Sequence, residues 1–229
     1  MKQLKTLVSA LMIGMISFQA HAHSAGDMIL RAGAISVNPN EDSDRIDVAG
    51  LATLQGVNVD LDTQLGLTGV YMLTDNVGIE LLAATPFTHD IKVKGTTIKA
   101  GDAKQLPPTI SLQYYFGEAS SQFRPYAAVG FNTTIFFDED VSQQLNSALD
   151  GIVGLPAGTV DASLELDPSY GLSAEVGFDY MLNDNWMING AIWYADIDTT
   201  ATIKTAVANV SFDVDIDPFV YFISVGYKF

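Results

Sequence analysis

Hydrophobic and polar residues alternate along much of this chain, and the alternation is concentrated in eight segments. A period of two places successive side chains on opposite faces of a β-strand. We therefore predict strands at 28–37, 64–73, 77–86, 109–117, 123–136, 170–181, 185–196 and 218–229.

The connections between these segments are alternately short and long. Short turns rich in Asp and Asn follow the second and sixth strands, and a five-residue turn follows the fourth. The long connections span about 38–63, 87–108, 137–169 and 197–217. Short periplasmic turns and long extracellular loops are typical of bacterial outer-membrane barrels. The predicted fold class is therefore all-β: an eight-stranded antiparallel transmembrane β-barrel.

The C-terminal segment carries the strongest local pattern. From Phe219 to Phe229 every odd position is aromatic or branched aliphatic, and the chain ends on Phe229. This ending resembles the signal that the barrel assembly machinery recognises in outer-membrane barrels. An edge strand of a soluble sandwich could alternate in the same way, but it would seldom end on an exposed Phe, because an unprotected apolar edge invites aggregation.

The polar side of the strands predicts what fills the barrel. In the periplasmic half the inward positions carry charged and amide groups, and a lumen enclosed by eight strands is narrow enough for side chains to fill. Buried charges must pair, so we predict a salt-bridge plug. The alternative is an aqueous pore, for which eight strands are few. The predicted plug residues are Arg31, Glu80, Gln113, Arg124, Glu175, Asp179 and Lys228.

The inward positions of the outer half are apolar instead. A pore built only to hold water would not choose such a lining, so these residues predict a funnel for a hydrophobic ligand. The alternative is a small core packed under the external loops, and the sequence does not separate the two. The predicted path residues are Ile35, Leu82, Phe136, Trp193, Val220 and Phe222.

Prolines mark the outer ends of the third and fourth strands. Pro86 ends the third strand, and Pro107 and Pro108 open the fourth. Proline donates no ladder hydrogen bond, so these strands cannot pair fully there. We predict a lateral opening in the wall at this point. The alternative is that the prolines simply start and stop strands.

The N-terminus predicts export. Residues 1–22 combine two lysines, an apolar stretch and an Ala-His-Ala ending, which is the pattern of a cleaved signal peptide. Its loss would leave 23–229 as the barrel and change the net charge from −16 to −18, because two lysines and no acidic residue are removed. Such a surface repels nucleic acid. The predicted location is the outer membrane, in contact with its lipids and lipopolysaccharide.

Residues for chemistry are scarce. The chain has no cysteine and no clustered metal ligands, so we expect neither metal nor cofactor. After the leader only His23 and His89 could serve as bases, and we expect His89 to be solvated in a loop. The apolar funnel and the lateral opening favour passive uptake of small hydrophobic molecules. A lipid-modifying enzyme and a structural or adhesive barrel remain as alternative functions. Acidic runs such as Asp138 to Asp140 are either a solvated surface or a place where divalent cations are shared with lipopolysaccharide.

Several stretches together resemble the OmpW family of outer-membrane proteins, which includes alkane-uptake proteins of the AlkL type. The resemblance covers essentially the whole chain after the predicted signal peptide, in the same order, and implies an eight-stranded barrel. It also implies a narrow hydrophobic channel entered from outside, from which small hydrophobic molecules leave sideways into the membrane. The matching stretches are QLGLT at 64–68, DNVGIELLAATPF at 75–87, LPPT at 106–109, YYFG at 114–117, FRPY at 123–126, WYADIDTTA at 193–201 and the last twelve residues.

Overall fold

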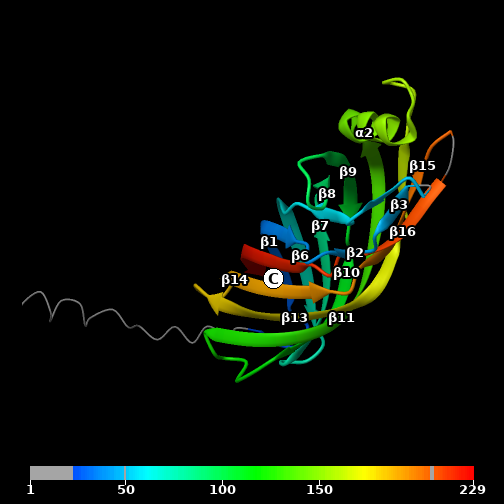
Figure 1. Ribbon diagram of the computed structural model, residues 1–229. Coiled ribbons are helices and arrows are strands. Elements are labelled where there is room, and N and C mark those ends of the chain that lie inside the picture. The colour runs from blue at the N-terminus through cyan, green and yellow to red at the C-terminus, as the bar shows by residue number, and fades with distance from the viewer. Residues whose placement is uncertain (1–22, 49, 207–208) are drawn as a thin grey trace, which may run out of the picture.

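A computed structural model describes residues 23–48, 50–206 and 209–229 (Figure 1). The signal peptide predicted for 1–22 lies outside the described residues. No helix within the described ranges is long and apolar enough to cross a membrane.

Eight antiparallel strands close into a barrel, as predicted. Around the ring they follow the order β10-β7-β6-β1-β17-β14-β13-β11, and β11 pairs with β10 to complete it. The predicted strand ends agree with the structure to within two residues, except that β11 runs five residues further. The strands are β1 (Met28–Asn38), β6 (Asp62–Met72), β7 (Val77–Ala84), β10 (Thr109–Tyr115), β11 (Phe123–Val141), β13 (Ser169–Met181), β14 (Trp186–Ala195) and β17 (Phe219–Lys228).

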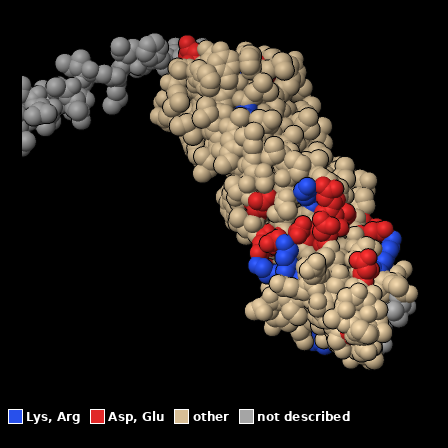
Figure 2. Space-filling model, turned by 90° about the horizontal axis from the view of Figure 1, so that it is seen from above, with Lys and Arg blue, Asp and Glu red and all other residues tan. Residues whose placement is uncertain are grey.

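The alternation along each strand separates an apolar outer wall from a buried interior. Leu30, Leu172 and Ile223 point outward and are 51%, 69% and 73% exposed, whereas Arg31 on the same strand as Leu30 is only 1% exposed. Lipid can cover such a wall without leaving backbone groups unpaired, because the ladder closes on itself. Figure 2 shows the same division, since the barrel surface carries almost no charge and the charged groups gather over the other end.

Asx and Thr side chains hold the periplasmic turns. Leu73 N donates to Val77 O at 2.8 Å, and the Thr74 hydroxyl accepts from Val77 N at 3.0 Å. The turn after β13 repeats this arrangement, with Asn183 Oδ1 accepting from Trp186 N at 2.9 Å. These side chains bond to nearby backbone and favour tight turns, which fixes the register of each hairpin.

The long connections differ from the predicted loops, because most of them contain regular structure. They fold into further strands that continue the barrel wall outward, with β8 and β9 pairing with each other and β9 extending the sheet from β11 (Figure 1). The reason is short-range alternation, as in Val210, Phe212, Val214 and Ile216, which builds a second apolar core. These elements are β2 (Asp42–Ser43), β3 (Ile46–Val48), β4 (Ala52–Leu54), β5 (Val57–Val59), β8 (Phe87–Val93), β9 (Lys99–Leu106), β12 (Ser163–Leu166), β15 (Asp198–Lys204) and β16 (Asn209–Asp215).

A short helix, α2 (Gln143–Val153), lies at the outer end of the molecule (Figure 1). Ser142 caps its N-terminus by accepting from Leu145 N, and Gly154 in the left-handed region ends it. Leu145 and Leu149 are buried against Val48 and Val93. The helix therefore covers the outer sheet.

Candidate functional site: a plugged lumen below two apolar cavities

A network centred on Arg31 occupies the periplasmic half of the lumen. The guanidinium donates to Asp179 Oδ2 at 2.6 Å and to Glu80 Oε1 at 3.0 Å, and all three side chains are 0–1% exposed. Arg31 Nη2 also donates to the Tyr115 hydroxyl at 2.8 Å. In so dry a site the ion pairs offset the cost of burying the charges only because several hydrogen bonds satisfy them at once.

The other predicted plug residues divide into two groups. The Gln113 amide lies 3.3 Å from Glu175 Oε2, and Arg124 packs its guanidinium over the Tyr115 ring at 5.3 Å, so both join the network. Lys228 lies near the end of β17, where its Nζ is 3.7 Å from Asp27 Oδ2. This position puts it below the plug.

His23 closes the network from below, although the sequence analysis gave it no role there. Its Nε2 lies 2.9 Å from Asp179 Oδ2, its ring is fully buried, and it meets the Tyr115 ring edge-on at 4.8 Å. No local sequence pattern marks this residue, because its burial depends on the chain folding back across the barrel mouth. Polar and charged side chains therefore fill the lower lumen, and most of their buried atoms are paired. Among the described residues, His23 Nδ1, Glu80 Oε2 and the Nε and Nη1 atoms of Arg124 have no hydrogen-bond partner.

Above the plug the lumen opens into an apolar space that we call the inner cavity. Its cavity volume is only about 20 Å³, and it reaches about 460 Å³ when all the free space out to its open mouth is included. Trp193 lines this space, whereas Phe222 does not line it but packs against Trp193 with ring centroids 6.0 Å apart. Four of the predicted path residues line the space, and the structure adds Val37 and Phe87 from the same height. The predicted residues on its wall are Ile35, Leu82, Trp193 and Val220.

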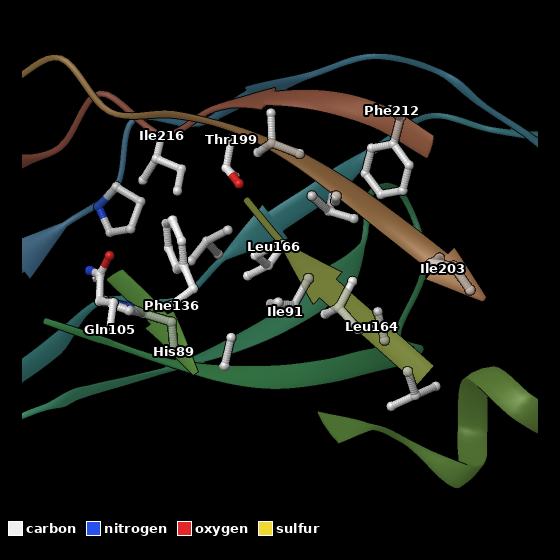
Figure 3. A pocket seen from close by; sticks show the side chains of 18 of the residues that line it. His89, Ile91, Gln105, Phe136, Leu164, Leu166, Thr199, Ile203, Phe212 and Ile216 are labelled. Carbon is white, nitrogen blue, oxygen red and sulfur yellow. Dashed lines mark hydrogen bonds between the residues drawn. The ribbon is translucent and has the colours of Figure 1, made fainter. Parts of the chain in front are cut away.

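A larger outer cavity lies within the outer sheet (Figure 3). Its cavity volume is about 70 Å³, and it reaches about 750 Å³ when all the free space out to its open mouth is included. Phe136 lines this cavity and not the inner one, because β11 extends beyond the barrel and carries Phe136 outward with it. Leu164, Leu166 and Ile203 face the same space from β12 and β15 (Figure 3). Five of the six predicted path residues therefore line one or the other of two cavities, and both cavities are lined by Gln105.

Gln105 lines both cavities and therefore lies where they meet, a position that we call the waist. Beside it, His89 Nδ1 lies 2.7 Å from the carbonyl oxygen of Asp60, which requires a proton on Nδ1. His89 Nε2 is then the acceptor for the Gln105 side-chain NH₂ at 2.9 Å. Burial lowers the pKa of His89, which keeps the ring neutral and preserves this arrangement.

The expectation that His89 is solvated is therefore wrong. The residue is 5% exposed because β8 turns its side chain into the outer cavity rather than outward. The alternation of Phe87, His89, Ile91 and Val93 could have indicated this from the sequence, since all four share one face of a strand.

The three prolines lie where the barrel ladder is interrupted. Pairing of β7 with β10 runs up to Leu82 and Thr109, and the next pair in the described chain is Phe87 with Gln105. The residues between, 83–86 and 106–108, include Pro86, Pro107 and Pro108.

On each side of this interruption, the chain bonds instead to the next strand of the barrel, β6 on one side and β11 on the other. Thr85 N donates to Leu65 O on β6 at 2.9 Å, and Thr133 N on β11 donates to Pro108 O at 3.0 Å. The two sides are therefore supported separately, and Pro107 lines the inner cavity beside them.

Three carboxylates meet at the outer rim of the barrel. The side-chain oxygens of Asp196, Asp198 and Asp217 lie within 4.8 Å of one another. Partial burial and the charge of Asp196 raise the pKa of Asp198. The spacing of these residues along the sequence does not reveal the group, because the tertiary fold brings Asp217 to the other two.

Comparison with known proteins identifies similar chains. A family model described as the OmpW family matches residues 24–229. The outer membrane protein W of Vibrio cholerae is 48% identical over 224 residues, covering 96% of each chain. The crystal structure of OprG from Pseudomonas aeruginosa shares 46% identity and superposes with a TM-score of 0.79, covering 91% of this chain and 98% of that one.

The structure of the outer membrane protein AlkL, determined by solid-state NMR in lipid bilayers, is more distant in sequence. It superposes with a TM-score of 0.63 at 19% identity, covering 90% of this chain and 92% of that one. This likeness bears on the fold alone and agrees with a barrel that spans the bacterial outer membrane.

Proposed function

The chain belongs to the OmpW family of outer-membrane proteins, and we propose that it is a passive channel for small hydrophobic molecules. Molecules enter the outer cavity from the external medium, pass Gln105 into the inner cavity and leave sideways into the membrane between β7 and β10. The observation that carries the proposal is the order of these features along the lumen: two apolar cavities lie directly above a filled polar plug.

Physical reasons favour this route. Charged lipopolysaccharide slows apolar solutes outside the membrane, so an apolar path past that layer speeds their entry without an energy source. The Arg31 network closes the direct way to the periplasm. The interrupted ladder beside Pro107 offers the way out, because it removes the backbone hydrogen bonds that elsewhere seal the wall.

The proposal extends to the partners. The exposed apolar wall contacts outer-membrane lipids, and the C-terminal strand ending at Phe229 engages the barrel assembly machinery. The acidic outer surface, including Asp138, lies where lipopolysaccharide and its divalent cations would meet it. Phe229 is 68% exposed, which supports its contact with the barrel assembly machinery.

A single cysteine at the interruption tests the lateral exit. Thr85 is exposed beside the gap, and the chain has no cysteine of its own, so Thr85→Cys gives one unique thiol. A bulky thiol reagent attached there should slow uptake of a small apolar fluorescent probe into cells by about tenfold. Before labelling, uptake should equal that of the unmodified protein.

Ile223→Cys is the control, since Ile223 is 73% exposed on β17, on the far side of the ring from β7 and β10. The same reagent at this position should leave uptake unchanged. Equal uptake with and without the label at Thr85→Cys would contradict an exit between these strands.

A further inference from the structure

Three buried polar atoms in the wall of the inner cavity have no hydrogen-bond partner among the described residues. They are Gln105 Oε1, Trp193 Nε1 and Ser173 Oγ. Their residues are 2%, 2% and 5% exposed, and all three line the inner cavity. One atom is an acceptor, one is a donor, and the hydroxyl is both.

The orientation of Gln105 follows from its neighbours. His89 carries its proton on Nδ1, which faces the Asp60 carbonyl, so His89 Nε2 can only accept. The Gln105 NH₂ group must therefore face His89, and its Oε1 must face away from it. Figure 3 shows the Gln105 amide at one end of the outer cavity, beside His89. The amide oxygen is thus kept unpaired at the waist.

Other polar groups around the same cavity are satisfied within the protein. Asn132 Nδ2 donates to the Thr109 hydroxyl at 2.8 Å, and Thr134 Oγ1 donates to Asn132 Oδ1 at the same distance. A path used only by hydrocarbons gains nothing from unpaired polar atoms, because each buried one is costly. A ligand that supplies the missing partners would regain that free energy on binding.

We propose that the inner cavity binds small apolar molecules that carry one hydroxyl group. The ligand hydroxyl donates to Gln105 Oε1 and accepts from the Trp193 Nε1 hydrogen, with Ser173 Oγ as a further partner, while the hydrocarbon body lies against Ile35 and Val220. This inference rests on the proposed channel and names its preferred cargo as neutral alcohols over plain hydrocarbons.

Three ligands with equal numbers of non-hydrogen atoms test the preference: 1-octanol, 1-methoxyheptane and n-nonane. The first both donates and accepts, the second only accepts, and the third does neither. Binding to the protein in lipid nanodiscs is measured by headspace gas chromatography, with empty nanodiscs subtracted. Each hydrogen bond should tighten binding roughly three- to tenfold, so affinity should fall in the order alcohol, ether, hydrocarbon.

Two substitutions assign the two hydrogen bonds separately. Gln105→Leu should weaken 1-octanol binding to the level of 1-methoxyheptane and leave the ether unchanged. Trp193→Phe should weaken both oxygen-containing ligands roughly three- to tenfold and leave n-nonane unchanged. Gln122→Leu makes the same chemical change as the first variant at an exposed periplasmic turn and should have no effect.

The ranking in the unmodified protein decides the matter even if a variant folds poorly. Equal affinities for all three ligands would overturn the hydroxyl preference while leaving an apolar channel standing. If no ligand is retained above the empty nanodiscs, both the preference and the channel are wrong. If Gln122→Leu weakened 1-octanol binding as much as Gln105→Leu does, the assignment of the hydrogen bond to Gln105 would also be contradicted.

Discussion

The two halves of this lumen are built by the same eight strands and the same alternation, yet they differ in what the inward positions carry. In the periplasmic half, the Arg31 guanidinium lies within hydrogen-bond distance of both Glu80 and Asp179, and these side chains fill the space. In the outer half, Ile35, Trp193 and neighbouring residues leave a cavity. The alternation of a strand thus determines that a barrel forms, and the inward residues determine whether it is closed or hollow.

The difference has a physical basis. Charges in a dry lumen must be matched by partners at short range, so the lower half tolerates few gaps. Apolar side chains make no such demand, and an apolar cavity can persist without water. Substitutions should therefore affect stability in the lower half and passage in the upper half.

The largest expected effect is the loss of the cation at the centre of the plug. Arg31→Leu leaves Asp179 and Glu80 buried without their shared partner, which should lower the free energy of unfolding by about 3–5 kcal/mol. Urea unfolding in lipid or detergent measures it. Arg45→Leu is the matched control, because Arg45 is exposed in the outer region, and it should change little. If Arg31→Leu and the unmodified barrel had the same free energy of unfolding, the predicted plug would be wrong.

A charge in the inner cavity should affect passage more than folding. Trp193→Asp places a carboxylate in an apolar space. An apolar probe must then pass either a charge that has lost its water or the water that the charge holds, and both oppose its passage. Uptake of the probe should therefore fall at least about tenfold. Leu51→Asp, in the exposed outer region, should leave uptake unchanged. Migration on gels with and without boiling checks that both variants remain folded. Normal uptake by a folded Trp193→Asp barrel would contradict the apolar path.

The smallest effect concerns His89 at the waist. Because its pKa in the folded protein is lowered, the unfolded chain takes up its proton first as pH falls below about 6.5, and the stability of the outer sheet should decrease below that pH. The slope is at most about 1.4 kcal/mol per pH unit. Hydrogen exchange in β8 and β9 measures it, and His89→Gln should abolish the dependence. A slope that persists in His89→Gln would assign it to other groups.

The barrel could be predicted from the sequence because lipid imposes one simple rule on every strand. Side chains alternate along a strand, so when Leu172 and Ile223 face the lipid, Glu175 and Ser224 on the same strands face the lumen. The eight strands, their order and most of the inward residues follow from this alternation. The same rule placed Arg31 and Asp179 in one lumen, although they are 148 positions apart.

The outer region followed less from the sequence, because its segments are short and pair over long distances. The alternation predicts that Phe136 lies in the barrel lumen, but β11 continues past the barrel and carries it into the outer cavity. His23 and Gln105 owe their roles to contacts across the fold, with Asp179 and His89 respectively, which no local pattern records.

The most direct test of the contrast between the two halves is to map where an apolar solute goes. A small aliphatic diazirine supplied from outside to intact cells, photolysed and located by mass spectrometry, should label inward residues of the inner cavity such as Val220 and Ile35, and Pro107 at the interruption. It should leave Tyr115 and Met187, which are buried in the lower lumen, unlabelled. Labelling of Tyr115 and Met187, or labelling confined to the lipid-facing wall, would contradict the account.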